Sequence, residues 1–242
     1  MGRIVCAGLG PGDPQLMSVK SDRAIREARH LAYFRKAGRP GQARRIVNGM
    51  LRDDVVEYAM EYPVTTEIPV QDGEYNRQLA EFYDYWAAKL QTLAAEEDIV
   101  VLCEGDPFLY GSFMHLHERL QGRAEVEVIP GIPSMAGCWN ILDTPFTWGD
   151  DILTVLMGTM PEDDMVPYMQ SADALVVMKI GRNLPAVRRA LTKAGKLDEA
   201  WLVVRGTMPD EQTARLSEYP KDTCPYFATV LVHGHGRRPR KL

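Results

Sequence analysis

Long apolar runs are missing from this sequence of 242 residues. No stretch approaches the roughly 18 consecutive apolar residues of a membrane-spanning helix. The chain also enters a strand-like pattern at Arg3 without the apolar core of a signal peptide. These absences predict a cytoplasmic protein with no membrane partner.

An excess of basic residues is missing too, because the formal net charge is −5. Nucleic-acid partners usually require a basic face, so we expect none here, although local basic patches can still exist. The 45% hydrophobic and 25% charged content is that of an ordinary soluble globular protein.

The sequence lacks paired cysteines and metal-ligand spacing. Its four cysteines form no C-x-x-C pair, and we interpret them as buried free thiols rather than as disulfides or metal ligands. His115 and His117 are two residues apart and so would lie on different faces of a helix. No metal is expected.

Short apolar runs alternate with helical spacing along most of the chain. This alternation predicts an α/β fold with parallel or mixed sheets, and several strands are apolar on both faces, as buried strands are. Helices are expected over Ser18–Ala28, over Glu74–Ala95 and from Tyr110 to about Leu120. Strands are expected at Ile4–Leu9, Leu31–Phe34, Val55–Met60, Ile99–Cys103, Val126–Ile129, Ile152–Met157, Ala174–Ile180, Trp201–Val204 and Tyr226–Val232.

A break at Gln121-Gly122-Arg123 predicts two α/β domains, residues 1–121 and 122–242. The segment 234–242 has no apolar residues to pack until the last position, so a solvated basic tail is expected.

The turn Gly8-Leu9-Gly10-Pro11-Gly12-Asp13 follows the first apolar run. Glycines allow sharp turns and a close approach of the main chain to a ligand. A dinucleotide-binding G-x-G-x-x-G would have glycine at position 13 and no proline inside the turn, so that fingerprint is absent. A purely structural turn capped by Asp13 is the alternative.

A second turn, Glu104-Gly105-Asp106-Pro107-Phe108-Leu109-Tyr110-Gly111, follows another strand-like run. Ligands of open α/β sheets bind beyond the carboxyl ends of strands, so such turns can face one crevice. Further turns of this kind are Pro130–Ser134, Met157–Thr159 and Arg205–Thr207.

Taken in order, these motifs resemble those of the tetrapyrrole methylases, the S-adenosylmethionine-dependent enzymes of the corrin and sirohaem pathways. The resemblance extends from G-x-G-P-G-D to the closing Tyr226-Phe227-Ala228-Thr229. The strings Tyr33–Arg39, Pro63–Glu67 and Cys103–Met114 are similar to the branch that methylates precorrin-2 at C20. Pro133 is a departure, because family members usually carry a small or hydroxylated residue there.

The resemblance implies a cofactor cleft between two α/β domains, with the first domain on the tetrapyrrole side and the second on the cofactor side. It implies a homodimer and S-adenosylmethionine as cofactor. Asp106 could accept hydrogen bonds from the cofactor or cap the following helix, and Met157 could contact adenine or belong to the core. By position, the cofactor-binding residues would be Gly10, Pro11, Glu104, Gly105, Asp106, Leu109, Pro133, Ser134, Met157 and Gly206.

The implied substrate is a tetrapyrrole ringed by carboxylates, which needs cationic partners. Arg35, Lys36 and Arg39, followed closely by Arg44 and Arg45, are the best local supply and are the predicted substrate-binding residues. A solvated basic surface is the alternative.

Methyl transfer to C20 needs no covalent intermediate, and loss of the C20 proton needs at most a modest base. His115, one helical turn after Ser112, is the first catalytic candidate, and Tyr110 is the second, as a donor to the macrocycle or a packing surface. A structural role for His115 is the alternative. The overall interpretation is C20 methylation of precorrin-2 or cobalt-precorrin-2. Its rivals are a sister methylase acting at another carbon and a non-catalytic nucleotide-binding α/β protein.

Overall fold

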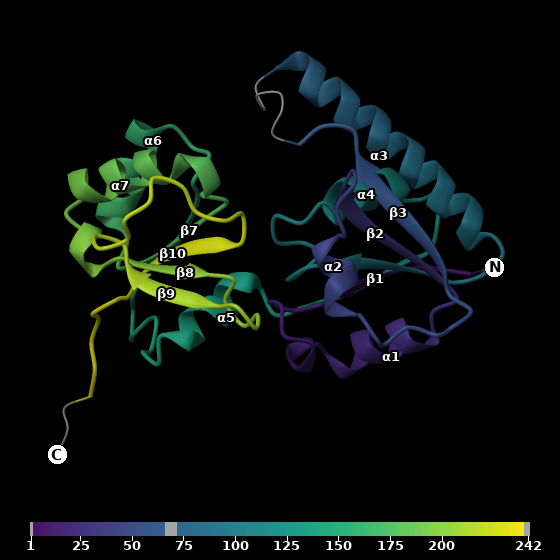
Figure 1. Ribbon diagram of the computed structural model, residues 1–242, viewed down its shortest axis with the longest axis horizontal. Coiled ribbons are helices and arrows are strands. Elements are labelled where there is room, and N and C mark those ends of the chain that lie inside the picture. Colours follow the sequence, from purple (N-terminus) through teal and green to yellow (C-terminus); the bar gives the residue numbers. More distant parts are fainter. Residues whose placement is uncertain (1, 66–71, 240–242) are drawn as a thin grey trace. The chain divides into compact units, whose positions relative to one another are not determined.

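Two β-sheets organise the chain, one in each of two compact units, Met1–Ser134 and Met135–Leu242. The computed structural model describes residues 2–65 and 72–239. Both units are α/β, as the alternating pattern predicted (Figure 1). The division falls later than residues 121 and 122, because Val126–Ile129 pairs with Ile4–Ala7 and so belongs to the first sheet.

The sheet of the first unit has the order β3-β2-β4-β1-β5, and all of its neighbouring strands are parallel. Strands β1 and β4 are buried along their whole length, as expected for strands covered on both faces. The elements of this unit are β1 (Ile4–Gly8), η1 (Pro14–Leu16), α1 (Val19–Glu27), β2 (His30–Lys36), α2 (Gln42–Ile46), β3 (Val56–Tyr62), α3 (Gly73–Ala94), β4 (Ile99–Cys103), α4 (Phe113–Leu120) and β5 (Val126–Ile129).

Helices cover both faces of this sheet (Figure 1). Residues of α3 and α4 such as Trp86 and Leu116 pack with Cys6 and Val101 on one face. Residues of α1 and α2 pack with the alternate strand residues on the other face. This alternation follows from the two-residue period of a strand.

The second unit has a mixed sheet with the order β6-β7-β10-β8-β9. Strands β6 and β7 are parallel, whereas β10 is antiparallel to β7 and β8, and β9 is antiparallel to β8. Helices α6 and α7 cover one face, and α5 packs on the other. The elements are α5 (Ser134–Ile141), β6 (Leu153–Met157), α6 (Glu162–Ser171), β7 (Ala174–Met178), η2 (Gly181–Asn183), α7 (Leu184–Lys193), η3 (Leu197–Glu199), β8 (Trp201–Val204), β9 (Gln212–Arg215) and β10 (Ala228–Val232).

Strand β9 was not predicted, because Gln212-Thr213-Ala214-Arg215 is polar and largely exposed. It is an edge strand, and Gln212 and Thr213 are exposed whereas Ala214 and Arg215 are half-buried. The hydrophobic pattern therefore carried no signal for it.

The expected solvated tail is wrong for its first residues. Gly234 and Gly236 pack against the carboxylate of Asp151 so closely that neither has room for a Cβ. The Arg238 guanidinium lies 4.2 Å from the centre of the Trp148 ring. Small residues and a cation–π contact hold this segment without apolar side chains. Residues 240–242 lie outside the described residues.

Candidate functional site

The carboxyl ends of all strands in the first sheet lie at one edge, because the strands are parallel. Every candidate residue of the first unit lies at one of these ends or follows it in the chain. The turn after β1 holds Gly10 and Pro11, and the loop after β2 holds Arg39. The turn after β4 begins at Glu104, and β5 leads to Pro133 and Ser134. The parallel sheet thus brings them to one side of the unit.

Two glycine turns are joined directly by their main chains. Gly105 N donates to Gly10 O at 2.8 Å, and Gly10 N donates to Gly105 O at 3.3 Å. Gly105 has φ +64°, a left-handed conformation that glycine adopts without strain. A Cβ on Gly105 would point into space beside Ser134 N, 3.5 Å away.

The third turn packs into this pair. A Cβ on Gly8 would lie 2.6 Å from Gly131 N, and a Cβ on Gly131 would overlap Gly105 O. Main chain therefore touches main chain at the ends of β1, β4 and β5. The turns after β1, β4 and β5 thus converge, and a ligand crevice that they share with the turns of the second unit stays a prediction.

The two aspartates of these turns bond to main-chain N–H groups. Asp13 Oδ1 accepts from Gln15 N at 2.8 Å and caps η1, which is the structural alternative considered for that residue. Asp106 Oδ1 accepts from Phe108 N at 2.9 Å, and its Oδ2 accepts from Gly131 N at 3.0 Å. Asp106 thus holds its own turn and the β5 turn together.

Glu104 bonds to a helix rather than to the glycine turns. Its Oε1 accepts from Ala43 N, at the start of α2, at 2.9 Å. Burial raises the pKa of the Glu104 carboxyl, and the N–H groups of Ala43 and of Glu104 itself partly oppose that rise.

Three of the basic side chains near α2 are engaged within the protein. Arg35 pairs with Glu61 at 2.5 Å and Arg44 pairs with Glu57 at 2.6 Å. Lys36 Nζ donates to Thr65 Oγ1 at 3.0 Å. Arg39 is exposed, and none of the ion pairs among the described residues involves it. Fewer basic side chains are therefore available to bind an anionic ligand than the sequence suggested.

His115 lies on α4, exposed, with its ring centre 4.8 Å from that of Tyr83 on α3. Ser112, one turn earlier, accepts a hydrogen bond from the Tyr62 hydroxyl and also bonds with Tyr83. Burial raises the pKa of Tyr83, partly offset by these hydroxyl contacts. Sequence reasoning missed Tyr62 and Tyr83, because only the packing of β3 and α3 brings them to Ser112.

Tyr110 and Leu109 lie in the loop between β4 and α4. Tyr110 has φ +56° and is 41% exposed. A non-glycine residue in this conformation is strained, and such residues cluster at ligand sites. Leu109 N donates to Asp106 O at 3.2 Å, and its side chain is half-buried.

The second unit has its own group of strand ends. Met157 is half-buried at the end of β6, paired in register with Met178 of β7. A Cβ on Gly206 would lie 2.9 Å from Cys138 Sγ, so protein fills that side of the glycine. Lys179, Arg205 and Thr207 all have positive φ, and burial lowers the pKa of Lys179.

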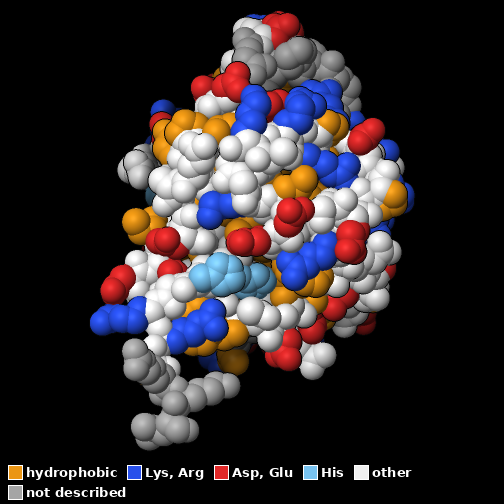
Figure 2. Space-filling view, turned by 90° about the vertical axis from the view of Figure 1, so that its left-hand side faces the viewer, with side chains coloured by type: hydrophobic (Ala, Val, Ile, Leu, Met, Phe, Trp, Pro, Cys, Tyr) orange, Lys and Arg blue, Asp and Glu red, His pale blue; other side chains and the backbone are white. Residues whose placement is uncertain are grey.

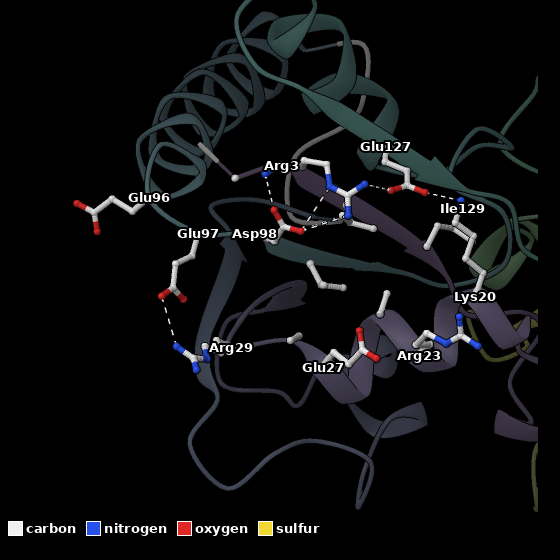
Figure 3. A pocket seen from close by; sticks show the side chains of 15 residues that line it. Arg3, Lys20, Arg23, Glu27, Arg29, Glu96, Glu97, Asp98, Glu127 and Ile129 are labelled. Atoms are coloured by element: carbon white, nitrogen blue, oxygen red, sulfur yellow. Dashed lines mark hydrogen bonds and ion pairs between the residues drawn. The ribbon is translucent and has the colours of Figure 1, made fainter.

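A charged hollow lies at the opposite, amino-terminal edge of the first sheet. It has a volume of about 630 Å³ and is lined by residues of α1 and of the segments before β1 and β4 (Figure 3). Arg3 pairs with Asp98 and Glu127, and Arg29 pairs with Glu97. It contains none of the candidate residues, and most of its cations are neutralised within the protein.

The four cysteines are free thiols; Cys6, Cys103 and Cys138 are buried, as predicted, whereas Cys224 is only half-buried. No group of ligating side chains suited to a metal occurs among residues 2–65 and 72–239. No helix in that part of the chain is long and apolar enough to cross a membrane.

A family model for tetrapyrrole (corrin/porphyrin) methylases matches residues 3–219. The chain belongs to this family. The tetrapyrrole methylase is 49% identical to a precorrin-2 C(20)-methyltransferase of Sinorhizobium sp, over 99% of this chain and 98% of that protein. It is 27% identical to the cobalt-precorrin-2 C(20)-methyltransferase of Salmonella typhimurium, over 96% of each chain.

Solved structures share the fold of this tetrapyrrole methylase. The uroporphyrin-III C-methyl transferase of Thermus thermophilus, complexed with S-adenyl homocysteine, has a TM-score of 0.67 and 20% identity, over 96% of this chain and 97% of that chain. The methyltransferase CobJ has a TM-score of 0.66 and 17% identity, over 100% and 98% of the two chains. The predicted α/β class and family are confirmed.

Charge on the tetrapyrrole methylase is mixed where Figure 2 displays it. Lysine and arginine side chains alternate with aspartate and glutamate, and histidine lies among them. The face displayed in Figure 2 therefore carries no broad basic patch.

Proposed function

We propose that this tetrapyrrole methylase transfers a methyl group from S-adenosylmethionine to C20 of precorrin-2 or of its cobalt form, in cobalamin biosynthesis. The observation that carries the proposal is the 49% identity to a precorrin-2 C(20)-methyltransferase over 99% of the chain. The strings Tyr33–Arg39 and Pro63–Glu67 support the C20 position, although Thr66 and Glu67 lie outside the described residues.

The glycine turns of the first unit fit a cofactor held by main chain. The space into which a Cβ on Gly105 would point is bounded by Ser134 N and Pro133 Cα, at 3.5 and 4.0 Å. Gly10, Pro11 and Leu109 belong to the joined turns and would complete this wall, with Asp106 fixing it. Met157 and Gly206 of the second unit stay predicted contacts, as does the sharing of one cofactor by both units.

When bound, S-adenosylmethionine supplies an electrophilic methyl group on its sulfonium. The protein's part is to bind and orient the acceptor, since alignment of two reactants supplies several kcal/mol of a barrier. Arg39 would bind a substrate carboxylate, with Arg35 and Lys36 next to it. Tyr110 would donate to the macrocycle or pack on it, and His115 would accept the C20 proton.

The test is incubation of the purified protein with precorrin-2 and S-adenosylmethionine labelled with ¹³C in its methyl group. A new methyl signal at C20 supports the proposal. A methyl group at another carbon identifies a sister methylase. A melting temperature that rises with NAD or ATP, and not with S-adenosylhomocysteine, would identify a nucleotide-binding protein without activity.

We further propose a cytoplasmic homodimer, on the basis of the resemblance. Light scattering coupled to size exclusion measures the mass directly. The mass of one chain at micromolar concentration would contradict the dimer.

A further inference from the structure

Helix α2 takes its cap from a distant residue. Its own N-cap residue, Gly41, has no side chain that could accept from the first N–H groups. Glu104 supplies the acceptor instead, through the 2.9 Å bond from Ala43 N. An unsatisfied N–H at a helix start costs stability, so this bond anchors the beginning of α2.

Helix α2 directly follows the loop that carries Arg39. This loop leaves β2 at Lys36, and residues 37–40 are exposed. A turn hydrogen bond joins Arg39 N to Lys36 O at 3.0 Å. At the other end, Gly41 lies tightly against β2, where a Cβ would stand 2.5 Å from Phe34 O. The loop is therefore held at Lys36 and at Gly41, and Gly41 leads directly into α2.

Strands β2 and β4 are parallel neighbours, so this loop and the Glu104 turn lie at the same edge of the sheet. Ala43 and Ile46 are the buried residues of α2, and Arg44 pairs with Glu57 of β3. Of these anchors, Glu104 alone comes from the turn that also contains Gly105. One residue thus connects the glycine turns to the basic loop.

We propose that Glu104 is a positioning residue for the tetrapyrrole substrate: its side chain fixes α2, and with it the loop that presents Arg39, and does not bind the cofactor. This inference rests on the proposed function and departs from the cofactor role that the family resemblance implied for Glu104.

The first experiment measures the anchor itself and needs no activity. Amide hydrogen exchange at Ala43 is compared in the wild type, Glu104→Ala and Glu104→Gln. Glutamine keeps an acceptor oxygen at the same distance, whereas alanine removes it. We expect exchange at Ala43 to be at least about tenfold faster in Glu104→Ala and close to wild type in Glu104→Gln. Unaltered protection in Glu104→Ala would overturn the proposal.

The second experiment separates substrate from cofactor. For Glu104→Ala we expect the KM for precorrin-2 to rise about tenfold, with the dissociation constant for S-adenosylhomocysteine within twofold of wild type. Glu104→Gln should restore the KM. Weakened S-adenosylhomocysteine binding with an unaltered KM would overturn the proposal and return Glu104 to the cofactor.

Should Glu104→Ala not fold, Glu104→Asp replaces it, because the shorter side chain withdraws the carboxylate from Ala43 N. A wild-type protein that does not methylate precorrin-2 would refute the proposed function, while the exchange measurement would still decide the anchor. The positioning role is supported if amide exchange at Ala43 and the KM for precorrin-2 both rise when residue 104 loses its acceptor oxygen and both return to wild type in Glu104→Gln.

Discussion

The carbonyl oxygen of Gly105 occupies the space in which a Cβ on Gly131 would stand. These two residues follow β4 and β5, which lie on either side of β1 in the sheet. Asp106 strengthens the contact by accepting from Gly131 N. The turns after β4 and β5 are therefore packed main chain to main chain, and each fixes the other.

Gly131→Ala should consequently destabilise the protein. The new methyl group must displace backbone rather than a flexible side chain, so we expect a loss of about 1–3 kcal/mol in the free energy of unfolding. Gly73→Ala is the control, because a Cβ there meets nothing within 4 Å. Urea denaturation measures both variants, and equal stability would show that the turns can separate without cost.

Gly105→Ala tests the proposed cofactor wall. Alanine at φ +64° costs about 1–2 kcal/mol of stability, and its Cβ enters the space beside Ser134 N. Gly122→Ala is matched, because Gly122 has φ +72° with nothing within 4 Å of a Cβ. Calorimetric titration should show S-adenosylhomocysteine affinity lower by about tenfold or more in Gly105→Ala alone. Equal affinities in the two variants would remove Gly105 from the site.

Arg39→Ala should raise the KM for the tetrapyrrole, because a charge-assisted contact is worth about 1.5–3 kcal/mol, or tenfold and more. Arg35→Ala should have a smaller effect, since Arg35 already pairs with Glu61. Cofactor affinity should be unchanged in both. Arg52→Ala is the control, because Arg52 pairs with Asp54 before β3, at the other edge of the sheet. A wild-type KM in Arg39→Ala would identify the loop as solvated surface.

His115→Ala should slow turnover by about 10²–10⁴-fold with little change in KM, if His115 accepts the C20 proton. The acidic limb of the pH profile should also disappear, because a protonated imidazole cannot act as a base. Glu118→Ala, an exposed change on the same helix, controls for damage to α4. Near-normal turnover with the wild-type pH profile would leave His115 as a packing partner of Tyr83.

The raised pKa of Glu104 predicts a pH dependence of stability. The folded protein binds the Glu104 proton more tightly than the unfolded chain, so this residue's contribution to stability falls as pH rises through the raised pKa. The melting temperature of Glu104→Gln minus that of the wild type should therefore increase from about pH 4.5 upward and then level off. A flat difference for Glu104→Gln would mean that the carboxyl is not desolvated.

Much of the fold followed from the sequence. Strands such as Ile99–Cys103 and Trp201–Val204 begin and end where their apolar runs do, because a strand covered on both faces must be apolar throughout. The glycine turns and the family were also evident, since a close backbone approach tolerates few other residues at those positions. Strand β9 escaped prediction, because Gln212–Arg215 carries no apolar run.

The tertiary structure decided what the polar side chains contact. Glu104 and Asp106 are separated by one residue, yet one bonds to α2 and the other to the β5 turn. Arg35 and Arg39 read alike as substrate cations, but only β3, at its register beside β2, places Glu61 against Arg35. Local sequence determines strands, helices and turns through short-range sterics and the periodicity of apolar residues. The partner of a charged or hydrogen-bonding side chain is determined by which distant strand lies beside it, and that is decided only when the sheet assembles.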